Sequence, residues 1–250
     1  MGHRTLSGLH IALTRESEAN AELAEVLARQ GASSYDCPLI RIVPPDDPAP
    51  LLEALKQIDA YEWLVLTSVN AARAVLSRAK PSPALRIGCV GSATSEFVRS
   101  HGLTVTLQPA RAHSKGMLEA LAEVGVQGAS VLWPRGDAAP TTLKDGLQAL
   151  GAVVDDPIAY RNVPDVAGLE SLSNLLRAGT LHAIAFASSS AAENASAAMA
   201  DGLKLLRIYS IGPSTSRTLE AAGLQLAGEA ADHSAQGLAQ VIIAGESQRA

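Results

Sequence analysis

Short runs of apolar residues alternate with longer amphipathic stretches along this sequence. The amphipathic segment Glu16–Gln30 carries Leu23 and Leu27 on one helical face, and Gly31 follows it as the C′ residue. The apolar runs have the length of buried β-strands and lie at His10–Thr14, Trp63–Leu66, Ile87–Val90, Ser130–Trp133, Ala183–Phe186 and Arg207–Ile211. Because strands and helices alternate, the pattern predicts parallel sheets covered by helices on both faces.

The same pattern occurs twice in the chain. Trp63–Ala72 reappears as Ala183–Ala192 about 120 residues later. Other matching segments are Val90–Thr94 with Ile211–Thr215, His113–Gly116 with His233–Gly237, and Ile11–Pro38 with Val131–Pro157. This repeat predicts two related flavodoxin-like α/β domains with a ligand-binding cleft between them.

Two proline-flanked segments, about 37–44 and 157–164, occupy equivalent places in the repeat. Each alternates apolar and polar residues, and no helix start follows directly. We expect them to form a two-stranded antiparallel β-ladder that links the domains. One domain is then residues 39–160, and the other combines residues 1–37 with 163–250.

Composition and charge exclude several classes of function. With 3% aromatic residues and a net charge of −5, the chain has neither stacking rings nor a basic patch for nucleic acid. No run approaches the roughly 18 apolar residues of a membrane span, and residues 1–7 lack the core of a signal peptide. Cys37 and Cys89 lie far apart without zinc-ligand spacing, so we expect buried thiols in a reducing, cytoplasmic compartment.

Polar residues follow the predicted strands in both halves. Ligands of parallel sheets bind at this edge, where helix N-termini attract anions. Each such residue alone is explained as a helix cap, whereas the repetition in both halves favours binding. The segments are Thr14-Arg15, Thr67–Asn70, Gly91–Thr94, Pro134–Gly136, Ser188–Ser190 and Gly212–Thr215. We expect His113 and His233, each followed by a serine, to cap helices rather than transfer protons.

Sequence motifs for common catalytic machinery are absent. No GxSxG, GxGxxG, GxxxxGK[ST] or paired-histidine metal motif follows a predicted strand. Tyr160 on the second linker is a candidate, because the first linker has Ile40 or Arg41 there and a phenol can donate a proton. Packing of its ring at the domain junction explains the residue equally well.

Together these segments resemble the uroporphyrinogen-III synthase family over essentially the whole chain. The resemblance rests on the order and duplication of Thr14-Arg15, Pro38, Thr67–Ala71, Val90–Thr94, Pro134–Gly136, Tyr160-Arg161, Ser188–Ser190 and Ile211–Thr215. It implies two flavodoxin-like domains joined by a two-stranded β-ladder. It also implies a lyase that cyclises hydroxymethylbilane to uroporphyrinogen III, with ring D inverted and water lost, and that requires no cofactor and no metal.

The resemblance implies roles for individual residues. Tyr160 matches the family's linker tyrosine and is the expected catalytic residue, assisting departure of the substrate hydroxyl. The residues expected to bind substrate are Thr14, Arg15, Ser68, Asn70, Ser92, Thr94, Arg135, Ser188, Ser190, Ser214 and Thr215. Ala187 stands where the family often has threonine, so that hydroxyl is missing here.

Two other functions stay open at this point. The chain is also compatible with a bilobed protein that binds an anionic small molecule without chemistry, and with a silent paralogue that acts as a regulatory domain. Tyr160 favours the enzyme. As partners we expect hydroxymethylbilane, with a transient contact to hydroxymethylbilane synthase left open, and neither nucleic acid nor membrane. We expect a monomer.

Overall fold

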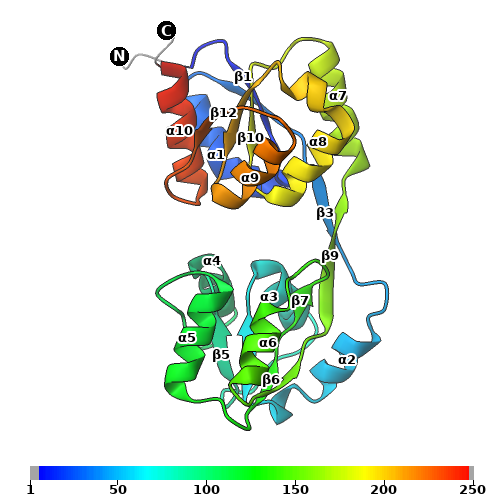
Figure 1. Ribbon diagram of the computed structural model, residues 1–250, viewed down its shortest axis with the longest axis vertical. Helices are drawn as coiled ribbons and strands as arrows, with labels where there is room; N and C mark the ends of the chain where they lie inside the picture. Colours follow the sequence, from blue (N-terminus) through cyan, green and yellow to red (C-terminus); the bar gives the residue numbers. More distant parts are fainter. Residues whose placement is uncertain (1–5, 248–250) are drawn as a thin grey trace. The chain divides into compact units, whose positions relative to one another are not determined.

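The computed structural model describes residues 6–247, which form two compact α/β units (Figure 1). Unit 1 combines Met1–Arg41 with Val163–Ala250, and unit 2 is Ile42–Asn162. The predicted lack of a signal-peptide core concerns residues 1–7, of which 1–5 lie outside the described part.

Unit 1 contains, among its described residues, a five-stranded parallel sheet in the order β12-β11-β10-β1-β2. Numbered along the chain within this unit, the order is 2-1-3-4-5, which is that of a flavodoxin-like fold. The strands are β1 (His10–Leu13), β2 (Ser33–Asp36), β10 (Ala183–Phe186), β11 (Arg207–Ser210) and β12 (Leu226–Glu229). The helices are α1 (Ser17–Arg29), α7 (Val166–Arg177), α8 (Ser189–Leu203), α9 (Pro213–Ala221) and α10 (Ala235–Ser247).

Helices cover both faces of this sheet because its central strands are apolar on both sides. Ile11 and Leu13 pack with Leu27 of α1 on one face. Ile184 and Phe186 of β10 belong to a separate buried cluster on the other face, with residues of α7, α8 and α9. Gly31 has a positive φ of 94°, which supports its predicted place after the end of α1.

Unit 2 repeats this sheet with a different chain order. Its four strands follow the order β5-β4-β6-β8, and an isolated parallel bridge from Gly88 to Leu107 extends it beyond β5. The strands are β4 (Trp63–Leu66), β5 (Arg86–Cys89), β6 (Ser130–Leu132) and β8 (Val153–Asp155). The helices are α2 (Ala49–Lys56), the 3₁₀ helix η1 (Ile58–Ala60), α3 (Val69–Leu76), α4 (Ser92–Ser100), α5 (Ser114–Val124) and α6 (Thr142–Ala149). The chain enters unit 2 at the strand equivalent to β10, so its sheet is a circular permutation of that in unit 1.

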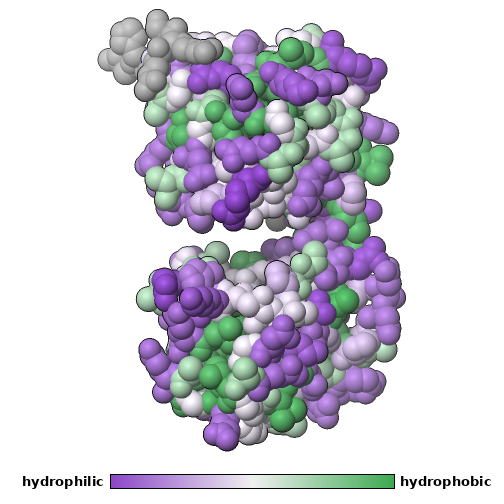
Figure 2. Space-filling view, viewed as in Figure 1, coloured by the Kyte–Doolittle hydropathy of each residue, from purple (hydrophilic) through white to green (hydrophobic). Residues whose placement is uncertain are grey.

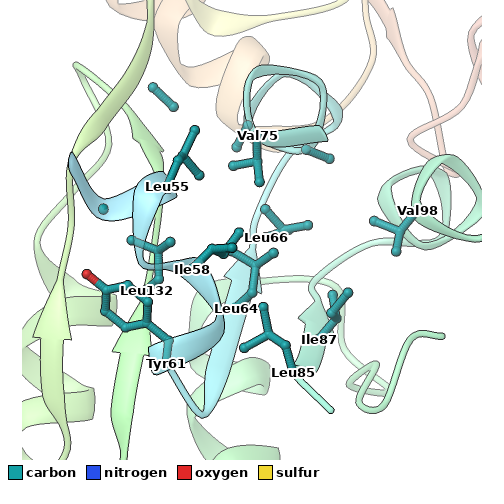
Figure 3. Close-up of a cluster of buried hydrophobic side chains, with 14 of the residues drawn as sticks. Leu55, Ile58, Tyr61, Leu64, Leu66, Val75, Leu85, Ile87, Val98 and Leu132 are labelled. Carbon is teal, nitrogen blue, oxygen red and sulfur yellow. The ribbon is translucent and has the colours of Figure 1, made fainter. Parts of the chain in front are cut away.

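The core of unit 2 also lies on both faces of its sheet. Figure 3 shows Leu64 and Leu66 of β4 beside Ile87 of β5, with Val75 of α3 near the top of the cluster. Trp63 belongs to the cluster on the opposite face, together with side chains of α5 and α6. The two predicted flavodoxin-like domains with parallel sheets are therefore confirmed.

A third, small sheet contains the two linker strands, β3 (Ile40–Val43) and β9 (Ile158–Pro164). The prediction of a two-stranded ladder is incomplete, because β7 (Arg135–Gly136) pairs in parallel with β9 and makes the sheet three-stranded and mixed. The Arg135 N–H donates to the Pro157 carbonyl at 3.0 Å, so the chain leaving β6 continues along β9.

The surface is that of an ordinary α/β protein. Figure 2 shows hydrophilic residues over most of the visible face of each unit, with smaller hydrophobic patches among them. No helix in the described part of the chain has the length and apolar character needed to cross a membrane.

Cys37 and Cys89 are both buried and free, as predicted. Burial raises the pKa of the Cys37 thiol and raises that of Cys89 to about 11.

We expect iodoacetamide at pH 8 to modify Cys89 at least about 100-fold more slowly in the folded protein than in denaturant, because the thiolate is the reactive form. Mass spectrometry of timed samples measures this ratio, and equal rates in the two states would contradict the placement of Cys89.

Candidate functional site

The polar strand ends gather at the carboxyl edge of each sheet. In unit 1 the strand order reverses at β1 and β10, and in unit 2 at the equivalent strands β6 and β4. Such a reversal is where open α/β sheets bind their ligands, because the loops after the two strands diverge there. The predicted site residues follow these strands and their neighbours in both units.

Ser68 and Tyr160 lie together in unit 2. Ser68 is the N-cap of α3, and its Oγ accepts from the Ala71 N–H at 3.1 Å. The same Oγ lies 3.1 Å from the Tyr160 hydroxyl, so either hydroxyl can donate to the other. The partly buried Tyr160 packs against the core cluster that contains Leu64 and Leu66. The structure thus joins the candidate catalytic residue to one of the candidate binding residues.

Asn70, Ser92 and Thr94 lie in the first turns of two neighbouring helices, α3 and α4. The N-cap of α4 is Gly91, which provides no side-chain acceptor for the amides of that turn. Ser92 is exposed, whereas Thr94 is buried in unit 2. The α4 terminus therefore offers backbone donors and the Ser92 hydroxyl, because a helix N-terminus leaves its first amides without partners in the helix.

Arg135 is bound within the protein. Its Nε donates to Oδ2 of Asp156 at 2.8 Å, and Lys144 Nζ donates to the other carboxylate oxygen at 2.7 Å. Burial of Asp156 opposes ionisation, but Lys144 and Arg135 outweigh it and the pKa of this carboxyl is lowered. This ion pair fixes β7 against the start of β9, and the role of Arg135 as a substrate ligand stays a prediction.

Asp156→Asn is expected to lower the free energy of unfolding by about 1–3 kcal/mol at pH 7, because it leaves two partly buried cations with a neutral partner. The pKa of Asp156 is depressed in the folded state, so its contribution is present above the ordinary value of about 3.9 and is lost as the pH falls through the folded value. Urea unfolding measures the free energy of unfolding at pH 7 and at pH 3. The difference in this free energy between wild type and Asp156→Asn should therefore be smaller at pH 3.

The matched control is Asp201→Asn, which removes an exposed carboxylate paired with Lys204. No measurable loss is expected there, since solvent screens this pair. A loss of stability for Asp156→Asn that is the same at both pH values would contradict the assignment.

Thr14 and Asn20 shape the loop after β1 in unit 1. Thr14 is buried, and its Oγ1 donates to the Ala185 carbonyl at 2.9 Å, which ties β1 to β10. The buried Asn20 amide donates to the Arg15 carbonyl at 2.7 Å and to Oδ1 of Asp36 at 2.8 Å. The Arg15 side chain is exposed. Thr14 thus ties two strands together, its role as a substrate ligand stays a prediction, and the Arg15 side chain is available for a ligand.

Asn20 was missed by the sequence reasoning, although a signal was present. It lies three residues before Leu23 and seven before Leu27, so it shares the apolar face of α1. A buried amide on such a face needs hydrogen-bond partners, and here it finds them in the loop that carries Arg15.

Ser188, Ser190, Ser214 and Thr215 lie at two adjoining helix starts in unit 1. Ser188 is the N-cap of α8 and accepts from the Ala191 N–H at 3.2 Å. The hydroxyls of Ser189 and Ser214 lie 2.9 Å apart, which brings the starts of α8 and α9 together. Ser214 is exposed and Thr215 is buried, as Ala93 is exposed and Thr94 buried at the equivalent positions in unit 2.

The two histidines differ from each other. His113 caps α5 as predicted, because its Nδ1 accepts from the Gly116 N–H at 3.0 Å. The prediction for His233 is wrong: Ser234 Oγ accepts from the Gly237 N–H at 3.0 Å instead. The second copy of this segment is one residue longer, and the capped amide lies three positions after the capping residue, so the cap moves to the serine.

Metal ligands are not clustered in the site. Among the residues that the structure describes, no group of three His, Cys, Asp or Glu side chains is arranged to hold a metal ion. The groups available to a ligand are hydroxyls, first-turn amides and the Arg15 side chain. Such groups bind carboxylates and other anions.

A protein-family model described as Uroporphyrinogen-III synthase HemD matches residues 21–240 of the chain. The chain belongs to the uroporphyrinogen-III synthase family. The uroporphyrinogen-III synthase of Synechococcus elongatus is 28% identical, in an alignment that covers 95% of this chain and 96% of that protein. The resemblance drawn from the sequence is therefore confirmed, and the alternative of a non-catalytic binding protein is not favoured.

Solved structures of uroporphyrinogen-III synthases share the fold. A mutant of the Thermus thermophilus enzyme gives a TM-score of 0.65 at 15% identity, covering 96% of this chain and 100% of that one. The enzyme from Helicobacter pylori gives a TM-score of 0.63 at 16% identity, covering 94% and 99% of the two chains. At these identities the likeness concerns the fold, and the roles of individual residues depend on the geometry described above.

Proposed function

We propose that this protein is a lyase that cyclises hydroxymethylbilane to uroporphyrinogen III, inverting ring D and releasing water. The observation that carries the proposal is the Tyr160 hydroxyl held 3.1 Å from Ser68 at the carboxyl edge of the unit 2 sheet. Membership of the uroporphyrinogen-III synthase family supports the substrate and the reaction. The same edge is where this fold class binds its ligands.

Tyr160 acts as the proton donor in this proposal. The phenol donates its proton to the departing hydroxyl of the substrate, so the carbon–oxygen bond breaks and water leaves. The substituted carbon of ring D then attacks the methylene carbon that has lost the hydroxyl and forms a spiro intermediate. The older bond from that ring carbon to the methylene beside ring C breaks, and this methylene bonds to the free α-carbon of ring D, which closes the macrocycle with ring D inverted. The proton released from the pyrrole at closure restores the phenol, so the net change is the loss of one water.

The main contribution of the protein is orientation. Hydroxymethylbilane closes unaided to the isomer in which ring D is not inverted, so the enzyme must make attack at the substituted carbon faster than direct closure. Holding the reacting atoms in that geometry lowers the entropic part of the barrier. No strongly basic surface is needed, in keeping with a net charge of −5.

Each unit by itself supplies hydroxyls and helix starts that can bind substrate carboxylates. Ser68, Asn70 and Ser92 belong to unit 2, and Arg15 belongs to unit 1. Unit 1 also supplies Ser188, Ser190 and Ser214. Each helix N-terminus contributes about 0.3–1 kcal/mol to binding an anion, so many weak contacts share the eight carboxylates of the substrate.

We also propose that the protein works as a cytoplasmic monomer. A substrate that cyclises without help favours rapid transfer from hydroxymethylbilane synthase, the enzyme that forms it. A transient contact between the two proteins would shorten the time in which the unwanted isomer forms.

Turnover with a small amount of protein tests this function. Hydroxymethylbilane is generated in situ, and the protein is added at about one hundredth of the bilane concentration. Enzymes typically accelerate reactions at least 10⁶-fold, so the bilane should disappear well before unaided closure. A binding protein would leave the unaided rate unchanged at this ratio, and so should heat-unfolded protein as the control.

A further inference from the structure

We infer that Gly136 is a positioning residue for Tyr160: the absence of a side chain at Gly136 leaves the space in which the phenol ring lies against Ser68. This inference rests on the proposed function, because it concerns the placement of the proposed proton donor. The sequence pattern places Gly136 only within the strand end Pro134–Gly136, a candidate binding segment, and gives it no part in placing Tyr160.

The pairing of β7 with β9 places Gly136 beside Tyr160. Arg135 pairs with Ile158, but Gly136 pairs with Tyr160, so the register shifts between the two residues of β7. Such irregularities in a strand pair redirect a side chain locally. Here the shift puts the backbone of Gly136 alongside the Tyr160 ring.

Steric contact with Tyr160, rather than backbone conformation, requires glycine at this position. Gly136 is absent from the glycines with positive φ, so its backbone suits other residues. A Cβ built on Gly136 would lie 3.0 Å from Cζ, 3.1 Å from the hydroxyl oxygen and 3.2 Å from Cε2 of Tyr160. These separations are shorter than ordinary van der Waals contact, so an added methyl group would displace the ring.

The backbone of β7 is fixed against β9 and has little freedom to move away. The Arg135 N–H donates to the Pro157 carbonyl at 3.0 Å, and the Asp137 N–H donates to the Tyr160 carbonyl at 3.1 Å. The ion pair between Arg135 and Asp156 holds the same segment through its side chain. Gly136 lies between these anchors, so the Tyr160 ring must yield to a larger residue.

Displacement of the ring would separate the Tyr160 hydroxyl from Ser68. The hydroxyl is placed by the serine on one side and by the contact with Gly136 on the other. Proton transfer is sensitive to such placement: a misplacement of about 1 Å can cost about 100-fold in rate, and the shift of a few tenths of an ångström required here costs less. Gly136→Ala is therefore expected to act on kcat through Tyr160.

The test combines tyrosine NMR with kinetics on the full chain. Protein labelled with ¹³C in its tyrosine rings has four tyrosines, and the Tyr160 signals are assigned by their loss in Tyr160→Phe. Gly136→Ala should shift the Tyr160 ring signals and leave those of Tyr35, Tyr61 and Tyr209 in place. Gly88→Ala is the matched control, because its Cβ would make only ordinary contacts, at 3.4 Å with Met117 and at 3.9 Å with Val65.

Kinetics then show whether the contact acts through Tyr160. Gly136→Ala should lower kcat about tenfold or more with KM changed less than about threefold, since substrate binding is shared by other groups. In the Tyr160→Phe background the same change should lower kcat no further. Gly88→Ala should leave both constants unchanged.

The outcomes separate this inference from the proposed function. Unshifted Tyr160 signals in Gly136→Ala, or a further loss of kcat in the Tyr160→Phe background, would overturn the positioning role. Normal turnover in Tyr160→Phe would instead overturn the proposed proton donor, whatever the NMR shows. If Gly136→Ala does not fold, Gly136→Ala with Tyr160→Leu should fold because the ring is gone, and its failure to fold would also overturn the inference.

Discussion

Tyr160→Phe is expected to lower kcat about 100-fold while the protein remains folded, because the variant keeps the ring and loses the proton donor. The lost hydrogen bond to Ser68 should lower the free energy of unfolding by only about 0.5–1.5 kcal/mol. Steady-state rates with hydroxymethylbilane formed in situ measure the first effect, and urea unfolding measures the second.

Tyr35→Phe provides the control for this prediction. Tyr35 is also partly buried, and its hydroxyl lies 2.8 Å from Nδ1 of His10 in unit 1, away from the strand ends that form the site. The control should lose a similar small amount of stability and keep its full kcat. Equal turnover in Tyr160→Phe and wild type would remove Tyr160 from the mechanism.

Gly168→Ala is expected to lower the melting temperature by about 10 °C, which is the largest effect on stability that the fold predicts. A Cβ on Gly168 would lie 1.7 Å from the carbonyl oxygen of Pro38 and 2.7 Å from its carbonyl carbon. Both contacts are with backbone inside unit 1, so no side-chain rotation relieves them. Thermal unfolding followed by circular dichroism measures the shift.

Gly202→Ala is the control for packing of a helix glycine in the same unit. Its Cβ would lie 3.2 Å from Cδ1 of Leu176, the end of a flexible side chain. The gain in helix propensity of up to about 1 kcal/mol offsets this contact, so little change is expected. A melting temperature for Gly168→Ala that matches wild type would show that α7 does not pack on Pro38 as described.

The sequence predicted the central strands because both of their faces are buried. All four residues of Trp63–Leu66 and of Ala183–Phe186 are buried, which is why each reads as a continuous apolar run. The edge strand β2 was missed because Ser33–Asp36 is polar and each of its four residues is half-exposed or exposed. Edge strands carry little hydrophobic signal, and pairing with a neighbour is what defines them.

The third strand of the linker sheet escaped prediction for a similar reason. Arg135-Gly136 is only two residues long, and its pairing with β9 depends on contacts made by tertiary structure. A turn and a two-residue strand look the same in a sequence. The duplicated sequence nevertheless predicted that the two sheets are equivalent. Each strand of the unit 2 sheet has a counterpart in unit 1, and the counterparts are neighbours in the same order across the sheet.

The sequence predicted where the residues of the candidate site lie, but not how their side chains are oriented. Their place at strand ends followed from the alternation of strands and helices, which fixes where each helix begins. Which hydroxyls point outward did not follow: Thr94 and Thr215 are buried, whereas Ser92 and Ser214 are exposed. That distinction depends on helix rotation against the sheet.

The contacts of Arg135 and Gly136 involve residues that are distant in the sequence. Arg135 was predicted as a ligand for an anion, and the structure also pairs it with Asp156, a carboxylate 21 residues away along the chain. Gly136 was predicted only as part of the strand end Pro134–Gly136, because its contact with the Tyr160 ring depends on strand pairing. Contacts of this kind become visible only once the strands are paired.

The central claim is that the protein directs ring closure with ring D inverted, and the isomer composition of the product tests it most directly. Hydroxymethylbilane is generated in situ with its synthase, this protein is added, and the products are oxidised and separated as porphyrin isomers. We predict that isomer III dominates with the protein and isomer I without it. Formation of isomer I alone in the presence of the folded protein would contradict the account.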